Sequence, residues 1–100
     1  MSEISFFQKK PVANPLIVLR EEFDDWAILF DPDTGDGFGL NPISVFIWKR
    51  LDGKHTIQDI LRELRENCED MPENVEQEIK DFIEELLGKG YAGYQVKHVE

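Results

Sequence analysis

The stretch GFGLNPISVFIW, residues 37–48, contains the change from strand to helix that decides the fold. Phe38 and Leu40 alternate with glycines, which is the period of a short β-strand. Asn41 and Pro42 then form a helix start, with asparagine as the N-cap and proline at the first helical position, where its missing N–H costs nothing. We therefore expect a strand that ends at Leu40 and a helix that begins directly after it.

The residues before this stretch have the pattern of two more strands. Residues 16–23, LIVLREEF, suit a strand, and the polar pair at 24–25 separates it from a second run at 26–30. One face of that second run carries Trp26, Ile28 and Phe30. Residues 31–37, DPDTGDG, are dense in turn formers. The order predicts a three-stranded antiparallel meander.

Three segments from Pro42 onward have the spacing of apolar residues that is typical of helices. Asp52-Gly53 ends the first helix, Thr56 caps the second with Asp59 reaching back, and Asn74 caps the third with Gln77 at the matching position. Gly88 or Gly90 ends the third helix. The inner stripes of the three helices are, in order, Ile43, Phe46, Ile47 and Leu51; Ile57, Ile60, Leu61, Leu64 and Cys68; and Val75, Ile79, Phe82, Ile83 and Leu86.

Three strands followed by three helices predict an α+β domain that is similar to a winged helix-turn-helix. We expect residues 1–15, which contain Pro11 and Pro15, to be a flexible N-terminal arm that lies over the domain. We expect residues 16–91 to form the domain and residues 92–100 to form a C-terminal tail, with one more strand at residues 91–96.

Charge excludes several classes of partner. The net charge of −10 repels nucleic-acid phosphates and anionic lipid headgroups, so we expect no nucleic-acid and no membrane partner. The longest uncharged stretch, residues 37–48, is far shorter than a membrane span of roughly 20 residues. The N-terminus does not have the pattern of a secretory signal, and the single cysteine, Cys68, suits a core position. These features predict a cytoplasmic protein.

The sequence contains no pattern for catalysis or for a cofactor. The aspartates of the turn resemble a calcium loop, but Asp36 stands where that loop needs glycine and Pro42 where it needs glutamate. His55 and His98 lack partners at metal-binding spacing, and no nucleophile elbow, P-loop or dinucleotide fingerprint is present. We expect a protein that is not an enzyme and binds no metal or other cofactor.

The outer face of the third helix is acidic. A winged helix that reads DNA would place this helix in the major groove, where carboxylates repel phosphates. Glu76 is also placed to pair with Lys80. The acidic face consists of Glu76, Glu78, Asp81, Glu84 and Glu85. The fold can therefore be shared with DNA readers without their function.

An ordered set of short motifs in residues 15–91 resembles the PqqD family of peptide chaperones. The motifs are Leu40-Asn41-Pro42, Ile47-Trp48, Leu51-Asp52-Gly53, then Thr56 and Ile60, followed by Ile79, Phe82, Leu86 and Gly90. The resemblance implies a stand-alone RiPP recognition element. Such a domain binds the leader of a ribosomally made precursor peptide and presents it to a modifying enzyme, often a radical SAM protein.

The resemblance also implies where the leader binds, namely beside the third strand and against the third helix. The strand at 36–40 would accept a guest strand on its free edge, and apolar side chains of the helix would form the wall. An acidic rim of Glu78, Asp81 and Glu85 would meet Lys or Arg of the leader. The predicted peptide-binding residues are Asp36, Gly37, Phe38, Gly39, Leu40, Glu78, Ile79, Phe82, Ile83 and Leu86.

Two other functions stay open at this point. One is an acidic winged-helix interaction or regulatory domain without a peptide client, and the other is a small subunit that completes an enzyme's active site. An exposed strand edge can also pair with itself, so a monomer, an edge-paired dimer and a strand-swapped dimer are all open.

Overall fold

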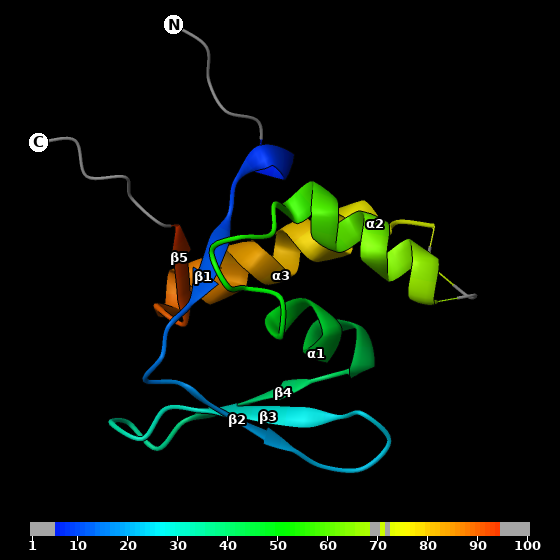
Figure 1. Ribbon diagram of the computed structural model, residues 1–100. Coiled ribbons are helices and arrows are strands. Elements are labelled where there is room, and N and C mark those ends of the chain that lie inside the picture. Colours follow the sequence, from blue (N-terminus) through cyan, green and yellow to red (C-terminus); the bar gives the residue numbers. More distant parts are fainter. Residues whose placement is uncertain (1–5, 69–70, 72, 95–100) are drawn as a thin grey trace, which may run out of the picture.

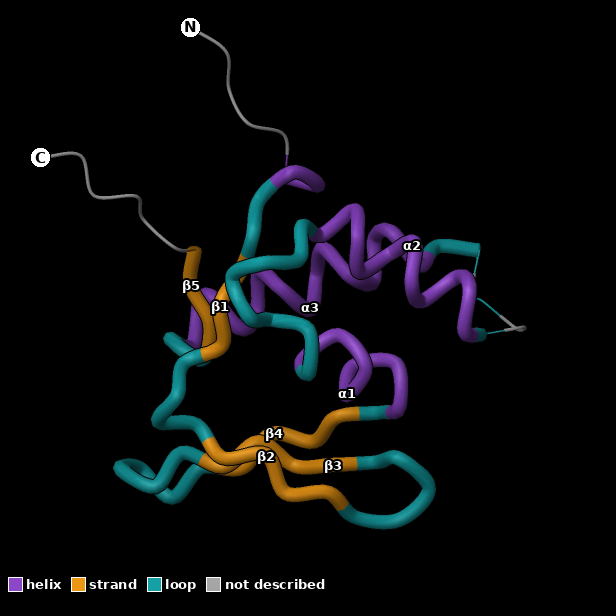
Figure 2. The backbone as a smooth tube through the Cα atoms, in the orientation of Figure 1, coloured by secondary structure: helices purple, strands orange, loops and turns teal. Residues whose placement is uncertain are grey.

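The computed structural model describes residues 6–68, 71 and 73–94, and it has the predicted α+β architecture. Figure 1 shows layers: a three-stranded sheet, helix α1 (Pro42–Trp48) above it, and helices α2 (Ile57–Asn67) and α3 (Val75–Lys89) beyond α1. A short strand pair, seen in orange beside α3 in Figure 2, lies apart from that sheet. The predicted order of sheet and helices is confirmed.

The three-stranded sheet is antiparallel in the order β2 (Val18–Glu21), β3 (Ala27–Phe30), β4 (Gly37–Leu40). β4 is therefore an edge strand, as predicted. The polar pair Asp24-Asp25 does form the first turn, and both residues have positive φ (53° and 66°), which type I′ hairpin turns require at both central positions.

The faces of β3 differ in burial in a way that the sequence did not indicate. Ala27 and Leu29 are buried in the core, whereas Trp26 and Phe30, on the alternate positions, are exposed. The run of apolar residues at 26–30 therefore contains one core face and one face that points away from the core.

Both chain ends contribute ordered structure outside residues 16–91. Phe6–Gln8 forms a 3₁₀ turn, and β1 (Pro11–Ala13), within the expected arm, pairs antiparallel with β5 (Ala92–Tyr94), within the expected tail. β1 also bonds to the α1–α2 connection, where Ala13 N donates to Leu51 O at 2.8 Å. Residues on both sides of the expected domain boundaries at 16 and 91 thus form hydrogen-bonded structure.

Helices α1 and α2 begin as their caps predict. The Asn41 side chain accepts from Ser44 N at 2.8 Å, with Pro42 in the first turn. Thr56 and Asp59 form a reciprocal capping box, in which each side chain accepts from the other residue's backbone N–H. The cap of α2 is followed by a stripe that is buried at Ile57, Ile60, Leu61 and Leu64.

Four expectations for the helices need correction. Helix α1 ends at Trp48, so Leu51 and the pair Asp52-Gly53 lie beyond it. Asn74 precedes α3 with ψ 32°, outside the extended region, and its side chain makes no capping hydrogen bond to the described residues. Gln77 donates to Asp81 at 2.8 Å, and Glu76 forms its ion pair with Arg65 of α2 at 3.2 Å. Cys68 lies just past the end of α2 and is partly buried. The predicted end of α3 at Gly90 is confirmed, with φ 77°.

A polar network joins the end of α1 to α2. Glu63 accepts from Arg50 Nε at 3.1 Å and lies 3.1 Å from His55 Nε2, and His55 Nδ1 lies 3.0 Å from Asp52. The pKa of the Asp52 carboxyl is well below its usual range because the Lys54 backbone N–H donates to it at 2.8 Å, and because His55 bonds to it through its ring and backbone. His55 thus belongs to a polar network between the α1–α2 connection and α2.

Acid should destabilise the domain through two aspartates. The Thr56 backbone N–H, and then its hydroxyl, lower the pKa of Asp59, as the contacts above lower that of Asp52. A carboxyl with a depressed folded-state pKa contributes stability above its unfolded pKa of about 3.9, and this stability is lost as the pH falls toward the folded value. Urea unfolding from pH 6 to 3 should therefore show a smaller loss for Asp52→Asn/Asp59→Asn than for the wild type. Parallel curves for the two proteins would contradict this assignment.

Candidate functional site

A groove of about 310 Å³ lies between strand β4 and helix α3, with α1 as its floor. β4 contributes Phe38 and Gly39, and α3 contributes an apolar pair flanked by carboxylates. The lining residues are Phe38, Gly39, Asn41, Ile43, Ser44, Ile47, Glu78, Ile79, Asp81, Phe82 and Glu85. The groove therefore joins an open strand edge to an acidic helix.

The backbone of β4 has free hydrogen-bonding groups on the groove side. Asp31 N donates to Asp36 O at 3.0 Å, and bonded and non-bonded pairs alternate along an antiparallel ladder. Phe38 and Leu40 thus bond to β3, whereas Gly37 and Gly39 direct their N–H and C=O groups toward the open edge. Two glycines, which have no side chain to block the approach, present the main chain to a guest strand.

An aromatic pair connects β4 to α3 within the groove. The rings of Phe38 and Phe82 are stacked, with centroids 6.5 Å apart and planes 10° apart. Lys89 Nζ lies 5.3 Å from the centre of the Phe38 ring. Both rings are only partly buried, so their remaining apolar surface is open to a ligand.

The rim along α3 is acidic. Glu78, Asp81 and Glu85 line the groove and are exposed, so the predicted rim lies where the sequence placed it. Their spacing of three and four residues puts them on one face of α3. Among the described lining residues, no lysine or arginine opposes them. The negative charge of this rim and the open edge of β4 together suit an extended ligand with cationic side chains.

The structure brings half of the predicted binding residues to this groove. Phe38, Gly39, Glu78, Ile79 and Phe82 line it. The others lie nearby in two settings: Asp36 and Gly37 precede the groove at the start of β4, whereas three side chains are in the core. Those core side chains are Leu40, Ile83 and Leu86, each at most 1% exposed.

Four lining residues of the groove were not anticipated: Asn41, Ile43, Ser44 and Ile47. They come from the start of α1, which the sequence indicates only as a helix with one buried stripe. The one sequence feature that indicates an open position on this helix is Ser44, a polar residue between two apolar stripe positions. That α1 forms the floor depends on how the helices pack.

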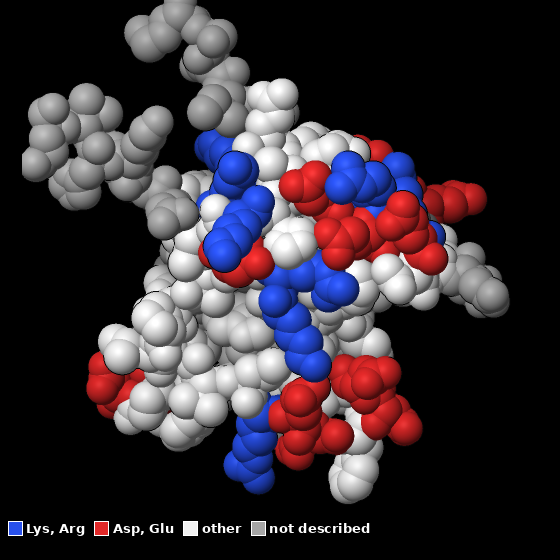
Figure 3. Space-filling view, in the orientation of Figure 1, with Lys and Arg blue, Asp and Glu red and all other residues white. Residues whose placement is uncertain are grey.

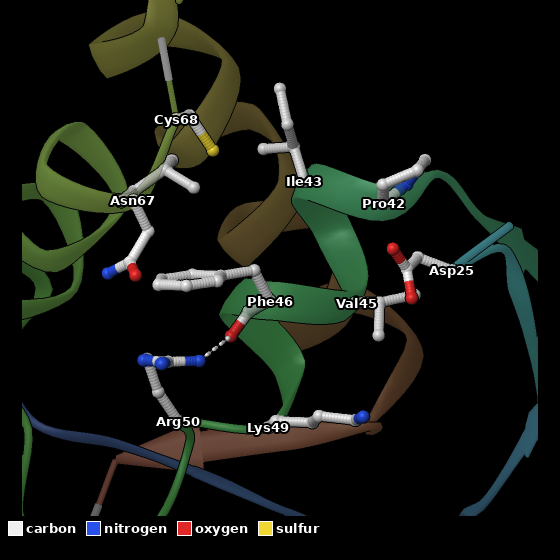
Figure 4. A pocket seen from close by; sticks show the side chains of 10 residues that line it. Asp25, Pro42, Ile43, Val45, Phe46, Lys49, Arg50, Asn67 and Cys68 are labelled. Atoms are coloured by element: carbon white, nitrogen blue, oxygen red, sulfur yellow. Dashed lines mark hydrogen bonds between the residues drawn. The ribbon is translucent and has the colours of Figure 1, made fainter.

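A second hollow, of about 370 Å³, lies on the other side of α1, facing α2 and the first hairpin turn. The Arg50 guanidinium lies 3.4 Å from the centre of the Phe46 ring and donates to Phe46 O at 3.1 Å, the bond drawn in Figure 4. Figure 4 shows Cys68 near Ile43 at the opposite end. Arg50 is already bound to Phe46 and Glu63, and the described residues that line this hollow include none from a strand, so we favour the groove beside β4.

Adjacent residues of α3 should differ in their effect on stability. Ile83 is fully buried, so Ile83→Ala should lower the free energy of unfolding by about 2–5 kcal/mol. Phe82 faces the groove and is partly exposed, so Phe82→Ala should cost less than about 3 kcal/mol despite the larger side chain removed. Urea unfolding measures both. A greater loss for Phe82→Ala than for Ile83→Ala would place Phe82 in the core.

Other findings limit the chemistry of the chain. The described residues contain no group of three or more His, Cys, Asp or Glu side chains placed to hold a metal ion. None of the helices in the described part of the chain has the length and apolar content of a membrane span. The described residues include no buried charged side chain, and the one phenol among the buried residues belongs to Tyr91.

Comparison with known proteins identifies the fold and the family. The structure is similar to that of TbiB1 in complex with the TbiA(beta) leader peptide, with a TM-score of 0.67 and 22% identity over 86% of this chain and 99% of that chain. A search of curated proteins found no match. Residues 27–92, from β3 to the start of β5, match the family model described as coenzyme PQQ synthesis protein D. The chain belongs to the PqqD family, as its ordered motifs predicted.

Proposed function

We propose that this chain binds the leader of a ribosomally made precursor peptide and presents it to a modifying enzyme. The leader adds as a strand beside β4 and rests against α3. The observation that carries the proposal is the open edge of β4, where Gly37 and Gly39 direct main-chain groups outward beside an acid-rimmed groove. Membership in the PqqD family supports this function, and so does the fold shared with TbiB1, a protein solved with a leader peptide.

In this proposal the chain is an adaptor and not a catalyst. Main-chain bonds at Gly37 and Gly39 supply affinity, and the Phe38 and Phe82 rings select apolar leader side chains. The enzyme that receives the leader is, by the family resemblance, a radical SAM protein. The adaptor works in the cytoplasm, where ribosomal precursors are made. An acidic interaction domain without a peptide client would not need the free main-chain groups of β4.

The edge-strand model predicts a sharp difference between two substitutions at one position. Gly39→Pro removes the outward N–H while leaving the ladder to β3 intact, so leader affinity should fall by about 1–3 kcal/mol, roughly 5- to 150-fold. Gly39→Ala keeps the N–H, and its Cβ would meet no atom within 4 Å, so its affinity should match the wild type. Fluorescence anisotropy with a labelled leader from the precursor encoded beside this chain measures both.

Two controls make this experiment decisive. Glu84→Ala, on the exposed part of α3 outside the groove, should leave leader affinity unchanged. Circular dichroism establishes that each variant is folded. If Gly39→Pro is folded and binds the leader as well as Glu84→Ala does, the leader does not pair with β4.

The acidic rim should accelerate association with a cationic leader. Each rim carboxylate should contribute about 0.2–1 kcal/mol through an exposed ion pair with a cation of the leader. The triple variant Glu78→Gln/Asp81→Asn/Glu85→Gln removes these pairs, so it should slow association and flatten the salt dependence of the association rate. The matched control neutralises Glu66, Glu73 and Glu84, which are exposed but lie outside the groove, and therefore has the same net charge. Stopped-flow rates at low and moderate salt compare the variants. Equal slowing of both would assign the effect to net charge and not to the rim.

A further inference from the structure

The outer face of the three-stranded sheet carries exposed apolar side chains that neither the core nor the groove uses. The strand register places alternate residues on this face, opposite to the buried Ala27 and Leu29. Val18 is 51% exposed, Phe30 is 40% exposed, and Trp26, just before β3, is 54% exposed. All five large hydrophobic residues that are exposed in the described part of the chain fall within residues 16–30.

The side chains of Val18, Trp26, Ile28 and Phe30 form one continuous strip. Val18 pairs directly with Phe30 across β2 and β3, and partly buried Ile28 lies between Phe30 and Trp26 on β3. On the β4 side the strip borders Gly37 and Gly39, which add no side chain to the face. A Cβ at residue 37 would lie 3.4 Å from Ile28 Cγ2, so glycine leaves Ile28 uncovered. Continuous exposed apolar surface of this kind marks an interaction site.

Acidic residues stand at both ends of the strip. Glu22 and Asp24 are exposed at the β2–β3 turn, and Asp33 and Asp36 are exposed at the β3–β4 turn. Figure 3 shows acidic side chains at the two ends of the sheet. Arg20 is the single cation that the described strand residues put on this face.

This arrangement selects the kind of partner. A second copy stacked on the strip would bring acidic turns against acidic turns in either orientation, because both ends are negative. Anionic lipid and nucleic acid are repelled in the same way. The complementary surface is that of a protein with an apolar centre and Lys or Arg at its margin.

We propose that the strip of Val18, Trp26, Ile28 and Phe30 is the surface on which the modifying enzyme docks; this rests on the function proposed above. A leader strand added to β4 extends the sheet, and its alternate side chains lie on this same outer face, beside Gly37 and Gly39. An enzyme on the strip therefore contacts the adaptor and the bound leader together. It recognises the loaded adaptor in preference to the empty one.

The test separates leader binding from enzyme binding. The variant Val18→Thr/Trp26→Thr/Phe30→Thr removes the apolar surface but keeps β-propensity, and thermal denaturation establishes that it is folded. Labelled leader measures the first step, and biolayer interferometry of the leader-loaded adaptor against the modifying enzyme encoded beside it measures the second. We expect leader affinity to stay within about 2-fold, and enzyme affinity to fall about 10-fold or more.

Charge variants supply the matched control. Asp24→Asn/Asp36→Asn should weaken enzyme binding, and asparagine tolerates the positive φ at residue 24. Glu66→Gln/Glu84→Gln on the helices makes the same change in net charge and should not weaken it. Failure of the wild type to bind leader would refute the proposed function. Normal leader binding with enzyme affinity unchanged in the triple variant would refute this docking surface alone.

Sedimentation velocity tests the alternative that the strip joins two copies of this chain. The wild type should sediment as a monomer at the concentrations used for binding. A dimer that the triple threonine variant abolishes would show that the strip joins two copies of this chain, and would overturn the inference.

Discussion

The structure depends on the packing of one short helix, α1, between the sheet and the pair of helices α2 and α3. Val45, Ile47 and Trp48 are buried in α1, and the sheet contributes Leu29 and Leu40 to the same core. The helix follows β4 without a connecting loop, because Asn41 caps it immediately after Leu40. This junction sets the position of the sheet relative to the helices, and Figure 1 shows α1 as the layer between them.

The same packing leaves β4 open. Because α1 lies between the sheet and the other helices, α3 is held beside β4 without covering its edge, and the space between them is the groove. An unpaired edge is ordinarily a risk of aggregation, and proteins limit it with short strands and charge. Here β4 is only four residues long, and carboxylates line its approach. Both features limit self-pairing while leaving main-chain groups available to a cationic guest.

The sheet separates two kinds of surface. Its edge presents main-chain groups to an added strand, and its outer face presents apolar side chains between two acidic turns. A guest strand at the edge would enlarge that outer face, so the two surfaces become one only when the edge is occupied. The proposed coupling would need no conformational change, since it would follow from the geometry of strand addition.

Much of this fold was predictable because it rests on local signals. The caps at Asn41 and Thr56, the turn at Asp24-Asp25 and the glycine at 90 each act through neighbouring residues. The cap at Asn74 was predicted wrongly because residue type alone does not determine its ψ. The pairing of β1 with β5 joins residues about 80 apart, and a three-residue strand has too little pattern to be detected in isolation.

For the candidate site, the sequence by itself determined the acidic face of α3, the glycine-flanked strand and the motifs of the PqqD family. Only the tertiary structure decided which side chains reach the groove. Phe82 and Ile83 are neighbours on one helix, yet one lines the groove and the other is in the core, because consecutive side chains of a helix point in different directions and only Ile83 is fully enclosed by the core. The outer strip was hidden for a similar reason: an apolar alternation shows that a strand has two faces, but only packing shows which face is covered.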